Sequence, residues 1–145
     1  MDPIYYFTDA IKKSADFKGR ATRKEFWIFS LIYTAIYVIF GLLDAFVGTI
    51  AIQFIFALVM SVPGVSVTTR RLHDTGRSGW WQLLFILPLI PVVGLFALVL
   101  LGGEDVLNLV VFAWAAWIAG CIVLLVFLAQ ASRGDNRYGP APQTE

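Results

Sequence analysis

The sequence has almost none of the residues that build covalent cross-links and metal centres: one cysteine, Cys121, and one histidine, His73. A single cysteine excludes a disulfide within the chain, and no Cys/His spacing fits a metal site, so we expect neither a metal nor another cofactor. Charged residues are also scarce at 14%, whereas 59% of the residues are hydrophobic. A soluble domain carries about 25% charged residues. This composition therefore predicts a membrane protein.

The first 25 residues also lack the apolar core and cleavage site of a removable signal peptide, because charges are spread through them. We therefore expect the first long apolar run to stay as an anchor. Residues 1–18 predict a short amphipathic helix, with Asp2 as its cap and Pro3 in its first turn. Such a helix either lies in the membrane interface or packs on neighbouring protein, and the sequence favours neither.

Four apolar runs predict four transmembrane helices, because each reaches the roughly 20 residues that cross a hydrocarbon core of about 30 Å. They cover approximately residues 26–46, 49–69, 80–101 and 106–129. Pro88 and Pro91 predict a kink in the third. The expected fold class is therefore all-α: a polytopic membrane protein of one domain, with four transmembrane helices, a short N-terminal amphipathic interfacial helix and a polar tail over residues 130–145.

The basic residues indicate the orientation of these spans. All eleven fall in three segments, residues 12–24, 70–77 and 133–137. Four crossings put the three segments on one side of the membrane. The charged residues of the turns on the other side are all acidic. Basic residues near span ends are retained in the cytoplasm, so we expect both termini to be cytoplasmic.

Three polar stretches meet the membrane on that side, and we expect them to touch one another and form a shared polar cap. The stretches are residues 17–27, 70–81 and 132–140. Arg20 or Arg23 is expected to pair with an acid from another stretch, Asp74 or Asp135. Glu25 either completes a capping box with Thr22 or pairs with an arginine of the central stretch.

The polar stretches also carry recognisable motifs. They read F-x-G-R-A-T-R-K-E-F-W, then R-R-L-H-D-T-G-R-S-G-W-W continued by L-P-x-x-P-x-x-G, and finally N-R-Y-G-P-x-P. This combination resembles, over nearly the whole chain, the domain of unknown function 805 family, the YhaH-like bacterial inner-membrane proteins. The resemblance implies a place in the bacterial cytoplasmic (inner) membrane and no established activity.

The arginines of the cap are candidates for binding phosphate, because a guanidinium group pairs with two phosphate oxygens at once. Glycines at 76 and 79 would let backbone N–H groups approach an anion, and Ser78 could cap the third span. The alternative is that the arginines only anchor the chain and the glycines only make turns. Tryptophans at the span ends suit an aromatic belt or, less simply, stacking on a ligand. The candidate ligand-binding residues are Arg20, Arg23, Arg70, Arg71, His73, Asp74, Arg77, Ser78, Trp80, Trp81 and Tyr138.

Two further pairs of residues have structural and functional interpretations. His73 and Asp74 could act as a catalytic base and its orienting group, but adjacent residues on a helix do not face each other, and no nucleophile is evident. We therefore favour a structural role, with Asp74 paired to an arginine. Asp44 and Gln53 flank the outer turn and are expected to hydrogen-bond, which would make Asp44 structural.

These observations favour a non-enzymatic membrane protein whose cap binds an anionic lipid headgroup, a phosphate-bearing ligand or a partner protein. Its partners would be the bilayer, including anionic lipids, and a second copy or another membrane protein, but no nucleic acid. One alternative is a small oligomeric transporter or channel, although no span carries a mid-membrane charge. Another is a membrane enzyme on lipid-linked substrates using His73 and Asp74, although no paired carboxylates are present.

Overall fold

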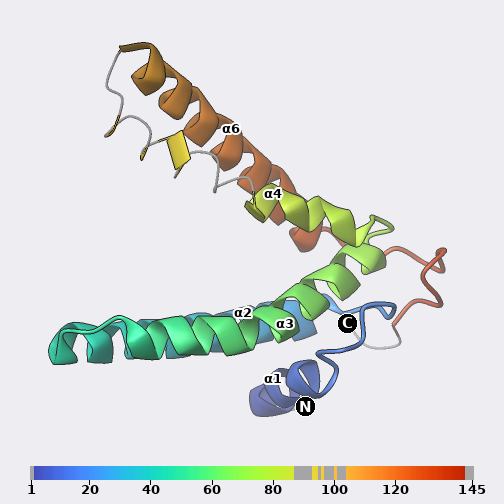
Figure 1. Cartoon of the computed structure of the whole chain (residues 1–145). Coiled ribbons are helices and arrows are strands. Elements are labelled where there is room, and N and C mark those ends of the chain that lie inside the picture. The colour runs from blue at the N-terminus through green and yellow to red at the C-terminus, as the bar shows by residue number, and fades with distance from the viewer. Residues whose placement is uncertain (1, 87–92, 95, 97–99, 101–103, 143–145) are drawn as a thin grey trace. The chain divides into compact units, whose positions relative to one another are not determined.

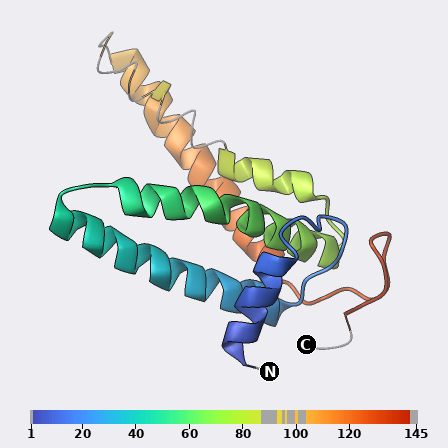
Figure 2. The ribbon, with the colours of Figure 1, turned by 60° about the horizontal axis from the view of Figure 1, so that its bottom comes forward.

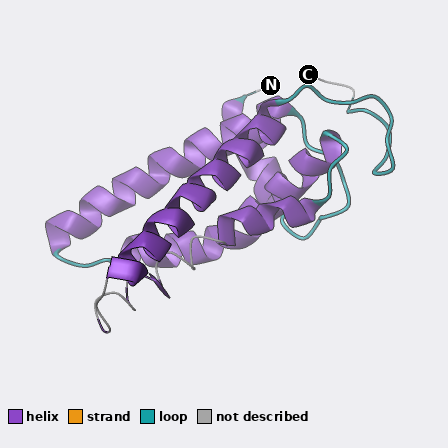
Figure 3. Ribbon diagram, turned by 90° about the horizontal axis from the view of Figure 1, so that it is seen from above, coloured by secondary structure: helices purple, strands orange, loops and turns teal. Residues whose placement is uncertain are grey.

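The computed structural model describes residues 2–86, 93, 94, 96, 100 and 104–142, and over these residues the chain is helical with connecting loops (Figure 1, Figure 3). The elements are α1 (Pro3–Lys12), α2 (Arg23–Val47), α3 (Ala51–Asp74), the short 3-10 helix η1 (Gly79–Gln82), α4 (Leu83–Ile86) and α6 (Glu104–Ala129). Within this described part the chain forms no strand, and one isolated bridge joins Asn136 to Gly139. The predicted all-α class is confirmed.

Three of these helices, α2, α3 and α6, are long and apolar enough to cross a membrane. They correspond to the first, second and fourth predicted spans. Of the third predicted span the structure describes η1, α4 and four residues beyond them. The predicted kink at Pro88 and Pro91 lies outside the described residues.

The chain divides into two compact units. One comprises Met1–Gly79 together with Ala131–Glu145, and the other comprises Trp80–Gln130. The tail that follows α6 therefore belongs with α1, α2 and α3 rather than with α6 itself. All the contacts of the polar cap described below lie within the first unit.

In the first unit α2 and α3 form an antiparallel hairpin, side by side along their length (Figure 2). Gly48 ends α2 in the left-handed conformation, with φ of 77°, which a residue without a Cβ adopts at no steric cost. The carboxylate of Asp44 then accepts hydrogen bonds from the backbone N–H groups of Ile52 (3.2 Å) and Gln53 (2.8 Å). Asp44 thus caps the first turn of α3, so the expected bond to Gln53 is made through the backbone.

Stacked aromatic rings hold the hairpin together. Phe29, Tyr33 and Tyr37 lie one above the other along α2, with ring centroids 6.4 and 5.9 Å apart. Phe56 of α3 stacks on Tyr33 at 5.5 Å, and Phe7 of α1 stacks on Phe29 at the same distance. The column therefore joins all three helices of the unit near the start of α2.

Helix α1 is shorter than the predicted 1–18, because it ends at Lys12 and the chain then turns. Asp2 caps it as expected, accepting a hydrogen bond from the N–H of Ile4. Its Ala10 is fully buried and, with Phe7, packs against the hairpin. The side chain of Ile4 is 65% exposed, so a second apolar edge stays uncovered.

The burial pattern of the unit is the reverse of that in a soluble protein. The largest fully buried side chains include Arg70 and Arg71, whereas Phe46 is 91% and Ile50 79% exposed. Apolar side chains on the outer surface of a helical hairpin are stable only where the surroundings are apolar too. This pattern agrees with a hairpin embedded in lipid and a polar interior at one end.

In the second unit α4 packs on α6. The ring of Trp81 meets Phe127 edge to face at 5.1 Å, and Gly120 lets Leu84 come close to the backbone of α6. The helix α6 begins at Glu104, two residues before the predicted span, and ends at the predicted Ala129.

Candidate functional site

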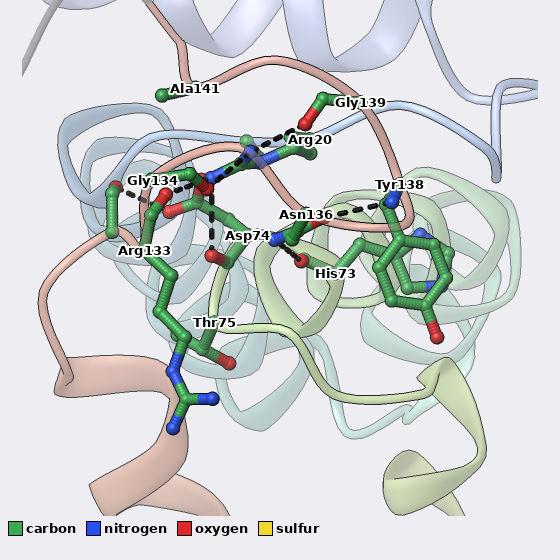
Figure 4. Close-up of polar contacts among 12 residues, drawn as sticks. Arg20, His73, Asp74, Thr75, Arg133, Gly134, Asn136, Tyr138, Gly139 and Ala141 are labelled. Atoms are coloured by element: carbon green, nitrogen blue, oxygen red, sulfur yellow. Dashed lines mark hydrogen bonds and ion pairs between the residues drawn. The ribbon is translucent and has the colours of Figure 1, made fainter.

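Asp74, the last residue of α3, is the centre of the polar cap. Its side chain is completely buried, and Oδ1 accepts a hydrogen bond from Nε of Arg20 at 3.0 Å and lies 2.8 Å from Nη2. The other oxygen, Oδ2, accepts hydrogen bonds from Arg71 and Ser132 (Figure 4 shows the surrounding contacts). A buried carboxylate is tolerated only when charge and lone pairs are both satisfied, and here both are.

The remaining N–H groups of Arg20 donate mostly to backbone carbonyls of the tail. Its Nη1 donates to the carbonyls of Gly139 (2.8 Å) and Gly134 (3.2 Å), and its Nη2 donates to those of Arg133 and Asp74 (Figure 4). One planar guanidinium therefore joins the loop before α2, the end of α3 and the segment after α6. The expected pairing of Arg20 with Asp74 is confirmed, as is the contact among the three polar stretches.

A second buried ion pair joins Arg70 of α3 to Glu25 of α2, with side chains 2% and 10% exposed. Glu25 also begins α2 conventionally, because its N–H donates to the hydroxyl of Thr22 at 3.1 Å. Of the two expectations for the Glu25 carboxylate, the pairing with a central arginine is the one formed. Within the described part of the chain, Nε and Nη2 of Arg70 are buried without a hydrogen-bond partner.

The turn that leads into Arg20 is fixed by Asp16. Its carboxylate accepts hydrogen bonds from the N–H groups of Lys18 (3.0 Å) and Gly19 (3.2 Å), which lower the pKa of Asp16 below its ordinary value. The hydroxyl of Ser66 donates to the carbonyls of Asp16 and Lys13, so α3 also holds this turn. The loop that carries Arg20 is thereby held against α3.

His73 makes a different set of contacts from its neighbour Asp74. Its ring stacks on Tyr138 with centroids 3.8 Å apart and planes 6° from parallel, and Arg137 lies 4.7 Å from the centroid of the same tyrosine ring. The side chain of Asn136 donates to the His73 carbonyl at 3.0 Å and accepts from the N–H of Tyr138 (Figure 4). His73 therefore anchors the tail, and no His–Asp pair of catalytic geometry is formed.

The helix α3 ends in a glycine turn that carries two more arginines. Gly76 has φ of 77°, its N–H donates to the His73 carbonyl, and the N–H of Arg77 donates to the Leu72 carbonyl. The side chain of Arg133 lies across this turn: a Cβ on Gly76 would be 3.4 Å from its Cδ. Burial, and secondly the positive charge of Arg133, lower the pKa of Arg77.

Nine of the eleven predicted site residues lie in the unit that contains the cap, and Trp80 and Trp81 lie in the other unit. The structure gives several of the nine internal partners that the sequence did not specify. The prediction missed Ser132 and Arg133, although both lie in a stretch recognised as polar, because nothing in their spacing indicates which tail residue reaches α3. Among the described residues no group of three or more His, Cys, Asp or Glu side chains could hold a metal ion.

Comparison with known proteins gives one consistent result. The family described as Protein of unknown function (DUF805) matches residues 14–140. Inner membrane protein YhaH of Escherichia coli (strain K12) is 31% identical, covering 97% of this chain and 98% of its own length. Inner membrane protein YhaI of the same strain is 30% identical, with 97% of both chains covered. No solved structure matches.

Proposed function

Since the chain belongs to the DUF805 family, whose members include inner-membrane proteins, we propose that it is a non-enzymatic multi-pass protein whose polar cap faces the cytoplasm and binds anionic phospholipid headgroups. The family itself carries no established activity. The proposal therefore depends on the charges of the cap and on where its acids are committed.

An excess of positive charge in the cap is the observation that carries the proposal. Residues 18–25, 70–79 and 131–142 contain nine lysines and arginines but only three acidic residues. Two of the acids, Glu25 and Asp74, are buried in ion pairs. The third, Asp135, accepts a hydrogen bond from the N–H of Ala141. Each basic residue near an anionic leaflet gains about 1 kcal/mol, so such a surface favours anionic lipid.

A fourth membrane crossing within residues 80–101 is part of the proposal. Ser132, just beyond the end of α6, donates to Asp74 at the end of α3. The 26 residues of α6 extend about 39 Å, more than a hydrocarbon core of about 30 Å. If α6 ends at the cap side, it begins on the far side, and the chain between α3 and α6 must also cross.

The helix α1 would lie at the headgroup level of the same leaflet. Its inner face packs on the hairpin, while Ile4 and Tyr5 are 65% and 50% exposed and Lys12 and Lys13 are also exposed. An apolar edge beside exposed lysines suits the boundary between acyl chains and anionic headgroups. The two expectations for α1, packing on protein and lying in the interface, are therefore compatible.

No observation favours an enzyme over this function. The carboxylate of Asp74 is filled by Arg20, Arg71 and Ser132, and the ring of His73 is covered by Tyr138. Neither group is placed to act on a substrate. The acid nearest the outer turn, Asp44, is likewise occupied as a helix cap, so it offers no ion pathway.

Lipid selectivity tests the proposal directly. Purified protein in mild detergent would be titrated with phosphatidylglycerol or phosphatidylcholine, and the retained lipids counted by native mass spectrometry. Preferential retention of phosphatidylglycerol that weakens as salt rises is the expected result, because the attraction is electrostatic. Equal retention of both lipids would overturn the proposal.

A further inference from the structure

We propose that Arg133 and Arg77 form a site for one phosphate group at the glycine turn that ends α3. This inference rests on the proposed function, because it specifies where a headgroup phosphate sits on the cap. It separates a geometric site from general attraction of anions by positive charge.

Within the described residues, the side chain of Arg133 forms no ion pair with an acid of the cap. Asp74 is filled by two arginines and a serine, and Glu25 is paired with Arg70. The side chain of Arg133 is exposed, and within the described ranges it forms no ion pair or hydrogen bond. Arg133 is therefore a guanidinium whose hydrogen-bonding capacity remains available to a ligand.

The backbone of Arg133 is held beside the glycine turn. Its N–H donates to the carbonyl of Asp74 at 3.2 Å. Its own carbonyl accepts from Arg20, which is anchored on Asp74 in turn. Because Gly76 has no Cβ, the side chain can lie directly over the turn, with Nη1 only 3.5 Å from where that Cβ would be. The backbone that carries this cation is thus held by hydrogen bonds at both its N–H and its carbonyl.

A second cation, Arg77, lies at the same turn. The N–H of Arg77 donates to the Leu72 carbonyl at 2.9 Å, and its Nη1 lies 3.4 Å from the carbonyl of Thr75. Arg77 and Arg133 therefore lie at the same peptide turn, and the charge of Arg133 contributes, after burial, to the lowered pKa of Arg77. Two like charges in this arrangement are relieved when an anion lies between them.

Phosphate is the anion that best fits two arginines. The planar fork of Arg133 can donate two parallel hydrogen bonds to phosphate oxygens, and Arg77 adds a second positive charge at the same turn. The shared chemistry could be supplied by a phospholipid diester or by a free phosphate. The site lies just past the last turn of α3, a candidate span, where headgroup phosphates are found.

A charge-matched set of variants tests the site. Arg133→Ala and Arg133→Lys would be compared with Lys24→Ala, an exposed basic residue on the first turn of α2 that removes the same charge outside the glycine turn. Phosphatidylglycerol binding in mild detergent would be measured by native mass spectrometry. We expect both Arg133 variants to weaken the tightest binding about tenfold or more, because lysine lacks the fork, while Lys24→Ala, which removes one charge of the cap, weakens it much less.

The outcomes separate the two proposals. A silent Arg133→Lys, or an equal loss from Lys24→Ala, would leave selectivity for phosphatidylglycerol intact but remove the site. A wild-type protein without that selectivity would instead remove the proposed function. If Arg133 only stabilises the C-terminal end of α3, its variants would lower the melting temperature without changing lipid binding, and the site would be wrong.

A soluble competitor identifies the source of the phosphate. Inorganic phosphate would be added to the phosphatidylglycerol complex of the wild type and of Arg133→Ala. Displacement of the lipid from the wild-type site alone supports a site that also accepts free phosphate. Retention of the lipid at every phosphate concentration supports a site specific for the membrane-bound diester.

Discussion

Arg20 shows how one side chain can organise one end of a helical membrane protein. Its donors are divided between a carboxylate and four backbone carbonyls, from two segments that are far from Arg20 and from each other in the sequence. A lysine carries the same charge but only three N–H donors on one atom, so it cannot reproduce this set. The role of Arg20 is therefore geometric, and the positive-inside rule alone does not account for it.

Replacement of Arg20 should destabilise the cap strongly. Arg20→Ala leaves the buried carboxylate of Asp74 with one arginine fewer, which typically costs about 3–5 kcal/mol. Arg20→Lys should be destabilised by a smaller amount, because lysine keeps the charge beside Asp74 but does not restore all the hydrogen bonds to the tail carbonyls. Unfolding in mixed micelles measures both. Arg137→Ala, at an exposed residue that lies over the tail tyrosine, serves as the control and should be nearly neutral.

A melting curve of Arg20→Ala that overlays the wild type would contradict this account. So would equal effects of Arg20→Ala and Arg137→Ala, because the contact network then contributes nothing beyond charge.

At the scale of elements, the sequence predicted the caps that begin α1 and α2 but misplaced the ends of α1 and α3. Thr22 and Asp2 cap α2 and α1 as their spacing indicates. The helix α3 was expected to stop near residue 69, where polar residues begin, but it continues to Asp74. Polar residues do not end a helix when other segments bury them. Instead, α3 ends at the glycine turn around residue 76.

The turn between α2 and α3 gives a clean test of helix capping in a membrane protein. Asp44→Ala removes the acceptor for two N–H groups at the start of α3 and should cost about 1 kcal/mol. Asp44→Asn should cost less, since the asparagine oxygen can still accept from one of the two N–H groups. Comparison of the unfolding free energies of the two variants provides the measurement. If asparagine is as damaging as alanine, the negative charge rather than the cap is what stabilises this turn.

The candidate site was only partly predictable, for a related reason. Hydropathy and charge placed three polar stretches together, and that contact is present. They could not indicate which arginines would be neutralised internally, because an ion pair depends on distances between side chains that are remote in sequence. Arg70 and Arg71 were expected as ligand-binding residues, yet their charges are committed to Glu25 and Asp74.

At the scale of the whole molecule, the number of crossings decides on which side each loop lies. Cysteines at 24, 49, 104 and 137, introduced after replacement of Cys121, would report the side by labelling with a membrane-impermeant reagent. Four crossings predict that 49 and 104 react from outside the cell membrane, whereas 24 and 137 react only after permeabilisation. Labelling of 104 only after permeabilisation would favour three crossings.

The contact between Arg20 and the tail has a consequence for biosynthesis. A ribosome makes the chain from its N-terminus, and Gly139 is added 119 residues after Arg20. Until the tail is made, the guanidinium has its acceptors on Asp74 but lacks the three carbonyls of the tail. Closure of the cap is therefore a final event that only a finished and correctly inserted polypeptide can complete. A chain truncated before Ser132 would never close the cap, and its Asp74 carboxylate would keep Arg20 and Arg71 but lose the serine hydroxyl.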